Sequence, residues 1–111
     1  MEASAANVNH PLRIRLEAEE LALIDLVRGE DKRSPWIRLA LEQVLDRWSG
    51  LPPREGLAPS QGTGERRAIP FRLPPDLLAR IEQVRGTHAR DVWIREAVVR
   101  YAATLQVSWG A

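Results

Sequence analysis

Cysteine is absent from this 111-residue chain, and Lys32 is the only lysine among its 16 basic residues. Without cysteine, the chain can form neither a disulfide framework nor a thiolate metal site. No apolar run approaches the about 20 residues of a membrane-spanning helix. The N-terminus also lacks the basic-then-apolar pattern of a secretion signal. These absences favour a small protein that works without a membrane partner.

The cations are therefore almost all arginine, although the net charge is only +1. The planar guanidinium group pairs bidentately with guanine edges and with phosphates. A GC-rich genome, whose codons favour Arg, Ala, Pro and Gly, explains the same enrichment equally well. The positions of the arginines in the fold must decide between these two explanations.

An internal repeat is the strongest signal in the sequence. Residues 12–41 align without a gap with residues 69–98 at a constant offset of 57, the offset from Arg15 to Arg72. Val-Arg-Gly and Trp-Ile-Arg triplets recur in this register, which chance similarity would rarely produce. Residues 49–65 separate the copies and are rich in Gly, Pro and Ser, as linkers are. We predict five segments: a disordered arm (1–10), copy 1 (11–48), a flexible linker (49–67), copy 2 (68–105) and a tail (106–111).

Each copy combines one strand with two helices. Residues 12–16 and 69–73 alternate between apolar and polar or proline residues, which is the period of a strand with one buried face. Gly29 and Gly86 end the first helices as C-cap glycines. We expect Ser34 to cap the second helix of copy 1, with Pro35 as its first residue, and Asp91 to cap the equivalent helix of copy 2.

One strand cannot form a sheet, and two short helices cannot cover their own apolar faces. Two copies remove both problems if their strands pair antiparallel above four packed helices. The outward face of this ribbon then carries Arg13, Arg15 and Arg72. The tryptophans Trp36 and Trp93 lie in the first turn of an apolar-striped helix, where core packing is favoured over stacking on bases.

The two copies resemble ribbon-helix-helix proteins, the superfamily of the Arc and MetJ repressors. The matching stretches are LRIRLEAEELALIDLVRGEDKRSPWIRLALEQV and IPFRLPPDLLARIEQVRGTHARDVWIREAVVRY, which cover nearly everything outside the arm, linker and tail. The resemblance implies a mainly α fold with a two-stranded antiparallel ribbon. Specifically, it implies a tandem ribbon-helix-helix chain, β-α-α-linker-β-α-α, that forms an intrachain pseudo-dimer. The linker length leaves exchange of copies between two chains open.

The resemblance also implies sequence-specific binding of double-stranded DNA, with the ribbon in the major groove. The residues expected to contact base edges are Arg13, Arg15 and Arg72. The residues expected to contact phosphates, at the start of the second helix of each copy, are Lys32, Arg33, Ser34, Trp36 and Arg90. Because the halves differ at the base-contacting positions, we expect an asymmetric DNA site. The function implied is that of a small transcriptional regulator, a repressor in the nucleoid of a prokaryotic cytoplasm, with possible self-association of several copies on DNA.

Two alternatives remain open at this point. One is a DNA-architectural or accessory factor of a mobile element or plasmid. The other is a protein-interaction module without DNA binding, such as an antitoxin-like or assembly partner. An enzyme is not expected, because no nucleophile, base and orienting carboxylate occur in a plausible arrangement. No cofactor or metal is expected either, because His10 and His88 are isolated from further ligands.

Overall fold

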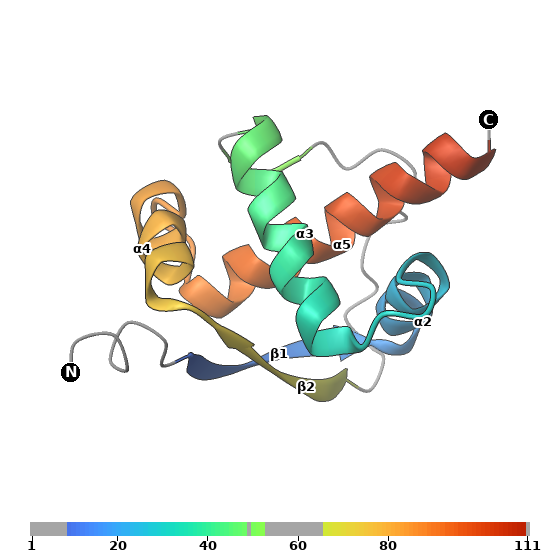
Figure 1. Ribbon diagram of the computed structural model, residues 1–111, viewed down its shortest axis with the longest axis horizontal. Helices are drawn as coiled ribbons and strands as arrows, with labels where there is room; N and C mark the ends of the chain where they lie inside the picture. The colour runs from blue at the N-terminus through green and yellow to red at the C-terminus, as the bar shows by residue number, and fades with distance from the viewer. Residues whose placement is uncertain (1–8, 49, 53–65, 111) are drawn as a thin grey trace.

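The computed structural model describes the backbone of residues 9–48, 50–52 and 66–110 and the side chains through residue 106. Within these ranges, the chain alternates one strand with two helices, twice over (Figure 1). The elements are β1 (His10–Glu17), α2 (Ala18–Val27), α3 (Arg33–Trp48), β2 (Arg66–Leu73), α4 (Pro75–Val84) and α5 (Arg90–Gly110).

Strands β1 and β2 pair antiparallel in a register that runs from His10 opposite Leu73 to Glu17 opposite Arg66. Alternation along each strand gives this ribbon two different faces. The inner face is apolar and buried, and it consists of Ile14, Leu16, Ile69, Phe71 and Leu73.

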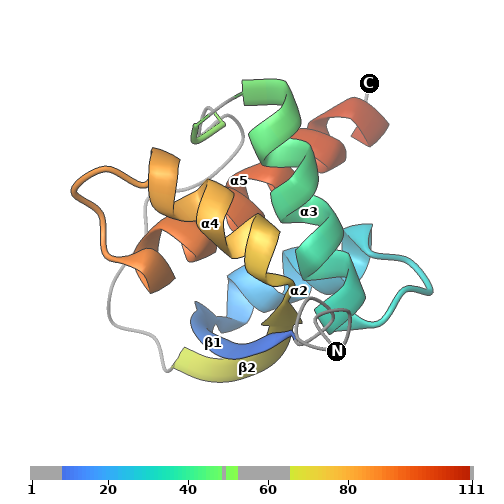
Figure 2. The ribbon, with the colours of Figure 1, turned by 60° about the vertical axis from the view of Figure 1, so that its left-hand side comes forward.

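All four helices lie on the inner side of the ribbon (Figure 1). The long helices α3 and α5 cross each other above it, and α2 and α4 lie at opposite ends (Figures 1 and 2). Apolar side chains from both halves form one continuous core, in which Ile37, Leu41, Ile81, Ile94 and Val98 are each at most 1% exposed. Burying several such side chains, at about 1.5–3 kcal/mol each, provides the main driving force for this arrangement.

A glycine follows each of the helices α2 and α4 by two residues. The amides of the capping residues Arg28 and Arg85 donate to the carbonyls of Ile24 and Ile81, each at 2.9 Å. Gly29 then takes φ +61° and Gly86 takes φ +60°. This left-handed conformation costs glycine least, and it turns the chain toward the second helix of each half.

The tandem ribbon-helix-helix prediction, with two copies forming a pseudo-dimer, requires correction. The described residues contain one two-stranded sheet and four helices in the order β-α-α-β-α-α, so there is a single ribbon and not clearly two. The physical reason is that each copy contributes only one strand, whose backbone groups find their partners on the other strand. The halves also share one core, so neither is a complete unit.

Several element boundaries differ from the expected segments. Strand β1 begins at His10, within the expected arm, and β2 begins at Arg66, within the expected linker. Helix α5 continues to Gly110 through the expected tail. Residue 9 of the expected arm and residues 50–52 of the expected linker are described, whereas positions 1–8, 49, 53–65 and 111 lie outside the described residues.

The expected N-caps also differ from the structure. Helix α3 begins at Arg33, and the amide of Trp36 donates to the carbonyl of Lys32 at 3.1 Å. Ser34 therefore lies inside the first turn and is not the cap. In α5, the amide of Trp93 donates to the carbonyl of Ala89 at 2.9 Å, so the helix starts two residues earlier than a cap at Asp91 would place it.

Candidate nucleic-acid interface

The outer face of the ribbon is the surface on which the predicted base-contacting residues lie. We use this name for seven exposed residues at outward strand positions: Pro11, Arg13, Arg15, Arg66, Ala68, Pro70 and Arg72. Each of the three predicted arginines lies opposite a small or cyclic residue, since Arg13 pairs with Pro70, Arg15 with Ala68, and Arg72 with Pro11. Like charges directly opposite each other would destabilise the ribbon, and this register avoids them.

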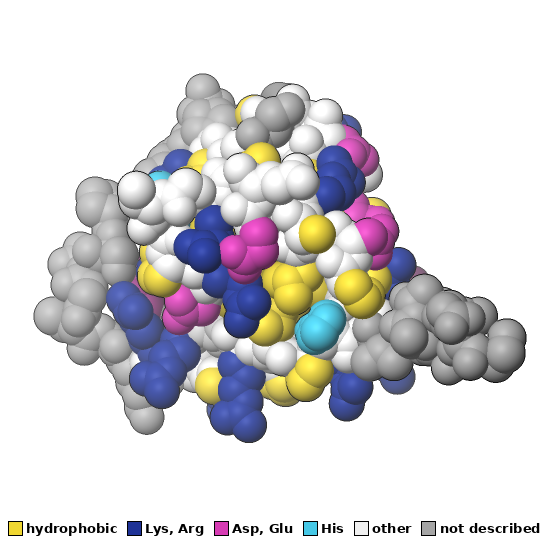
Figure 3. Space-filling model, turned by 90° about the vertical axis from the view of Figure 1, so that its left-hand side faces the viewer, with side chains coloured by type: hydrophobic (Ala, Val, Ile, Leu, Met, Phe, Trp, Pro, Cys, Tyr) yellow, Lys and Arg dark blue, Asp and Glu magenta, His cyan; other side chains and the backbone are white. Residues whose placement is uncertain are grey.

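The predicted arginines of the outer face have no carboxylate partner within the described ranges. Among the residues that the structure describes, no ion pair is made by Arg13, Arg15 or Arg72. Ion pairs between described residues involve arginines of the helices or of the turns between them, namely Arg28, Arg33, Arg80, Arg85, Arg90, Arg95 and Arg100. Figure 3 shows Lys and Arg side chains along the lower edge of the molecule, the side on which Figure 1 places the ribbon.

Arg66 and Arg67 extend the cationic surface and were not among the predicted site residues. Both are exposed, and Arg66 lies opposite Glu17 at the end of the ribbon. They were assigned to the linker because they follow a run rich in Gly, Pro and Ser. The strand alternation of residues 66–73 begins directly after that run, and this pattern could have placed Arg66 on the ribbon.

Ser34 connects helix α3 to the ribbon. Its hydroxyl oxygen accepts a hydrogen bond from the backbone N–H of Arg72 at 3.2 Å. Ser34 and Arg72 lie between two open hollows, one of which includes Arg13 and Pro70 and the other Arg38 and Leu39. This contact places the N-terminus of α3, with its positive dipole end, beside the outer face.

Trp36 belongs to the core, although its amide was predicted to contact phosphate. The side chain is 4% exposed, and its ring centroid lies 6.1 Å from that of Tyr101. Its N–H already donates to the carbonyl of Lys32. Lys32 itself is exposed at the end of the turn, and no described carboxylate forms an ion pair with it.

Arg33 is held by Asp25 across the turn between α2 and α3. Its Nε and Nη2 atoms donate to the two carboxylate oxygens at 3.0 and 2.9 Å. Arg28 adds a third contact, from Nε to Asp25 Oδ1 at 2.8 Å. Hydrogen bonding from Arg33, opposed by partial burial and assisted by Arg28, lowers the pKa of Asp25 to about 2. In turn, the hydrogen bond to Asp25 raises the pKa of Arg33.

Copy 2 repeats this arrangement at the same offset of 57. Glu82 accepts from Arg85 Nε at 2.7 Å, and Arg90 Nη1 lies 3.6 Å from its other oxygen. We call Asp25, Arg28 and Arg33 the first turn cluster, and Glu82, Arg85 and Arg90 the second. The two clusters account for two of the four pairs of repeated arginines by local structure. Arg90 is nevertheless held by one longer contact, so its guanidinium group is easier to redirect than that of Arg33.

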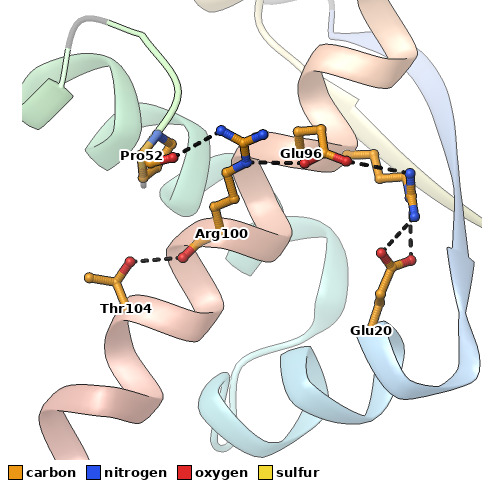
Figure 4. Close-up of polar contacts among 6 residues, drawn as sticks. Glu20, Pro52, Glu96, Arg100 and Thr104 are labelled. Atoms are coloured by element: carbon orange, nitrogen blue, oxygen red, sulfur yellow. Dashed lines mark hydrogen bonds and ion pairs between the residues drawn. The ribbon is translucent and has the colours of Figure 1, made fainter. Parts of the chain in front are cut away.

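A further polar network joins the two halves (Figure 4). Arg95 of α5 pairs with Glu20 of α2 at 2.7 Å, with both side chains 13–14% exposed. Arg100 donates from Nε to Glu96 at 3.0 Å and from Nη1 to the carbonyl of Pro52 at 3.1 Å. These contacts hold α2 and the 50–52 segment against α5, the helix that also packs against β1 of the ribbon.

The described part of the chain contains no group of three or more His, Cys, Asp or Glu side chains that could hold a metal ion. His10 and His88 are both exposed. None of the described helices is long and apolar enough to cross a membrane.

Comparisons with protein-family models, with curated proteins and with solved structures find no match to this chain.

Proposed function

We propose that the outer face of the ribbon binds double-stranded DNA in a sequence-specific manner, and that the protein is a small transcriptional regulator acting as a repressor. The observation that carries this proposal is the separation of two kinds of arginine. Helix and turn arginines are largely neutralised by carboxylates, whereas Arg13, Arg15 and Arg72 project from the ribbon without such partners in the described structure.

The dimensions of the ribbon suit the DNA major groove. That groove is about 12 Å wide and admits a two-stranded ribbon. Outward side chains at alternate strand positions then face the base edges. An arginine can donate two hydrogen bonds to guanine O6 and N7, and such a pair discriminates against the wrong base by about 1–3 kcal/mol. Pro70, Ala68 and Pro11 opposite the arginines are short, so they leave room for this approach.

Phosphate contacts would come from the edges of the ribbon. The Ser34–Arg72 contact places the start of α3 beside the outer face, where Lys32 and the helix dipole both favour an anion. At the other half, Arg90 begins α5 and is exposed. In this proposal, Arg90 exchanges its single longer contact with Glu82 for a phosphate, while Arg33 remains bound to Asp25.

The test begins with selection of a duplex from a random pool by the full chain, followed by titration at several salt concentrations. Specific binding through several phosphates predicts an affinity that falls linearly with salt on a log–log plot. Arg15→Ala and Arg72→Ala should each weaken binding to the selected duplex by roughly fivefold to 150-fold while changing binding to unrelated DNA little.

Arg47→Ala is the matched control. Arg47 is exposed in the last turn of α3, about 20 Å along the helix from its ribbon-proximal end. The charge change is the same, but specific affinity should stay within about twofold. A DNA affinity without any sequence preference would favour the architectural role instead. No salt-dependent DNA affinity at all would overturn the proposal and favour a protein-interaction module.

A further inference from the structure

The register of the ribbon contains an approximate twofold relation that follows the sequence repeat. Arg13 pairs with Pro70, and Pro70 is also its counterpart in copy 2 at the offset of 57. On either side, Pro11 pairs with Arg72 and Arg15 with Ala68. A twofold rotation about the Arg13–Pro70 pair therefore exchanges each of these two flanking pairs for the other.

This relation sorts the three arginines into two classes. Arg15 and Arg72 are counterparts in the repeat, and they lie two positions from the central pair, on opposite strands and on the same face. Arg13 lies at the centre and has no arginine counterpart, because the equivalent position holds Pro70. Arg15 and Arg72 are therefore symmetric, and among the three predicted base-contacting arginines the asymmetry lies at the centre, at Arg13.

The distance between Arg15 and Arg72 along the ribbon predicts the spacing of the bases that they would contact. Arg15 and Arg72 are separated by four residue steps along the ribbon, which is about 13 Å. That length corresponds to about four base-pair steps at about 3.4 Å each. Because the two arginines are related by a twofold axis, they meet identical groups on the two DNA strands. Arg13 meets a base on one side of the axis only, since Pro70 has no side-chain donor.

We propose that the target is an inverted repeat whose two contacted guanines lie about four base-pair steps apart on opposite strands, and that Arg13 sets the direction in which the chain lies on this target. Arg13 is then a specificity-determining residue of a particular kind. It distinguishes the two orientations of an otherwise symmetric site. This inference rests on the proposed DNA binding through the outer face.

Other differences between the halves do not determine the orientation of the chain on DNA in the same way. Lys32 of copy 1 corresponds to Ala89 of copy 2, but a lysine at the start of a helix contacts phosphates, which carry no sequence information directly. Arg66 has Asn9 as its counterpart and lies at the end of the ribbon opposite Glu17. Arg66→Ala is therefore the matched control for Arg13→Ala, because both remove an exposed ribbon arginine without an arginine counterpart.

The first experiment selects duplexes from a random pool with the wild-type chain and with these two variants. The wild type should give an inverted repeat with one directional position at its centre. Arg13→Ala should give the same outer guanines with no base preference at the centre, and Arg66→Ala should retain the directional centre. A directional centre that survives Arg13→Ala, or outer guanines at a clearly different spacing, would overturn the inference.

The second experiment measures orientation directly. Because the chain has no cysteine, Asp31→Cys in the exposed turn before α3 provides a unique site for an iron chelate that cleaves nearby DNA. On one fixed duplex, the labelled protein should cut one flank at least about fivefold more than the other. Adding Arg13→Ala should make the two flanks equal, whereas adding Arg66→Ala should not.

These results separate the inference from the proposed function. If no motif is enriched and no salt-dependent affinity is found, DNA binding itself has failed. If a motif is enriched but Arg13→Ala leaves the orientation preference unchanged, DNA binding stands and only the assignment of direction to Arg13 is wrong.

Discussion

The ion pair between Glu20 and Arg95 should contribute much more to stability than an equally short ion pair elsewhere in the molecule. Its N–O distance is 2.7 Å and its side chains are 13–14% exposed. The pair between Arg80 and Asp46 has a distance of 2.8 Å, but its side chains are 46% and 59% exposed. Both pairs join a helix of one half to a helix of the other, so the difference between them is the greater burial of Glu20–Arg95, together with a second Arg95–Glu20 hydrogen bond at 3.3 Å and an Arg95–Glu96 contact at 3.5 Å.

The expected magnitudes follow from that difference. Exposed pairs contribute between 0 and about 1 kcal/mol, whereas breaking a fully buried pair by removing one partner costs about 3–5 kcal/mol. The exposed fraction of the Glu20–Arg95 pair places it between these limits, at about 2 kcal/mol. A loss of this size would lower the melting temperature of such a small domain by roughly 10 °C. For the Arg80–Asp46 pair we expect about 0.5 kcal/mol or less.

The assay is a pair of double-mutant cycles measured by urea unfolding at neutral pH. Glu20→Gln retains an oxygen that can accept the hydrogen bond now donated by the amide of Glu17 at 2.9 Å, and Arg95→Met retains the aliphatic part of the side chain. Asp46→Asn and Arg80→Met form the matched cycle. Equal coupling energies in the two cycles, or a larger one for the exposed pair, would refute the reasoning from burial.

Three further predictions concern the turns and the ribbon. The pKa of Asp25, about 2, lies below its unfolded value, so its contribution is present above about pH 4 and is lost as the pH falls toward 2. Because the side chain is 32% exposed, we expect this contribution to be at most about 1 kcal/mol. The measurement is the difference in unfolding free energy between wild type and Asp25→Asn, which should be present at pH 5 and absent near pH 2. Ser34→Ala should accelerate amide exchange of Arg72 and cost about 1 kcal/mol or less; unchanged exchange would show that the 3.2 Å contact is not maintained in solution. Gly29→Ala and Gly86→Ala should each cost about 1–2 kcal/mol through backbone strain alone, because an added Cβ meets nothing within 4 Å; a much larger loss on urea unfolding would point to a clash.

Local patterns in the sequence were sufficient to locate the strands and the interhelical turns. Period-two alternation marked residues 12–16 and 69–73, which lie within β1 and β2. Gly29 and Gly86 occupy the left-handed region, as the C-cap pattern suggested. The helix starts were less predictable, because Ser34 has a strong capping preference but the first intrahelical acceptor is the carbonyl of Lys32. The register in which the two strands pair depends on contacts between distant segments, which no local pattern specifies.

For the candidate site, the sequence identified exposed cations but not their partners. Arg33 and Arg90 were assigned to phosphate, yet each faces a carboxylate of the preceding helix. The repeat contained a signal for this, because an acid recurs at Asp25 and Glu82 in the same register as the arginines. Three-dimensional proximity across a turn was needed to connect the two observations. The lack of such partners around Arg13 in the described structure likewise becomes visible only once the ribbon is formed.

The sharing of one core by both halves has a consequence for how the protein unfolds. Helix α5 of one half packs against α2 and β1 of the other, and α3 packs against β2. Neither half can therefore open without exposing apolar surface of its counterpart. The transition should be cooperative across the whole described structure, with a calorimetric enthalpy equal to the van't Hoff enthalpy. A destabilising substitution in either half should then lower the protection of core amides in both, so the sequence repeat does not correspond to two independent folding units.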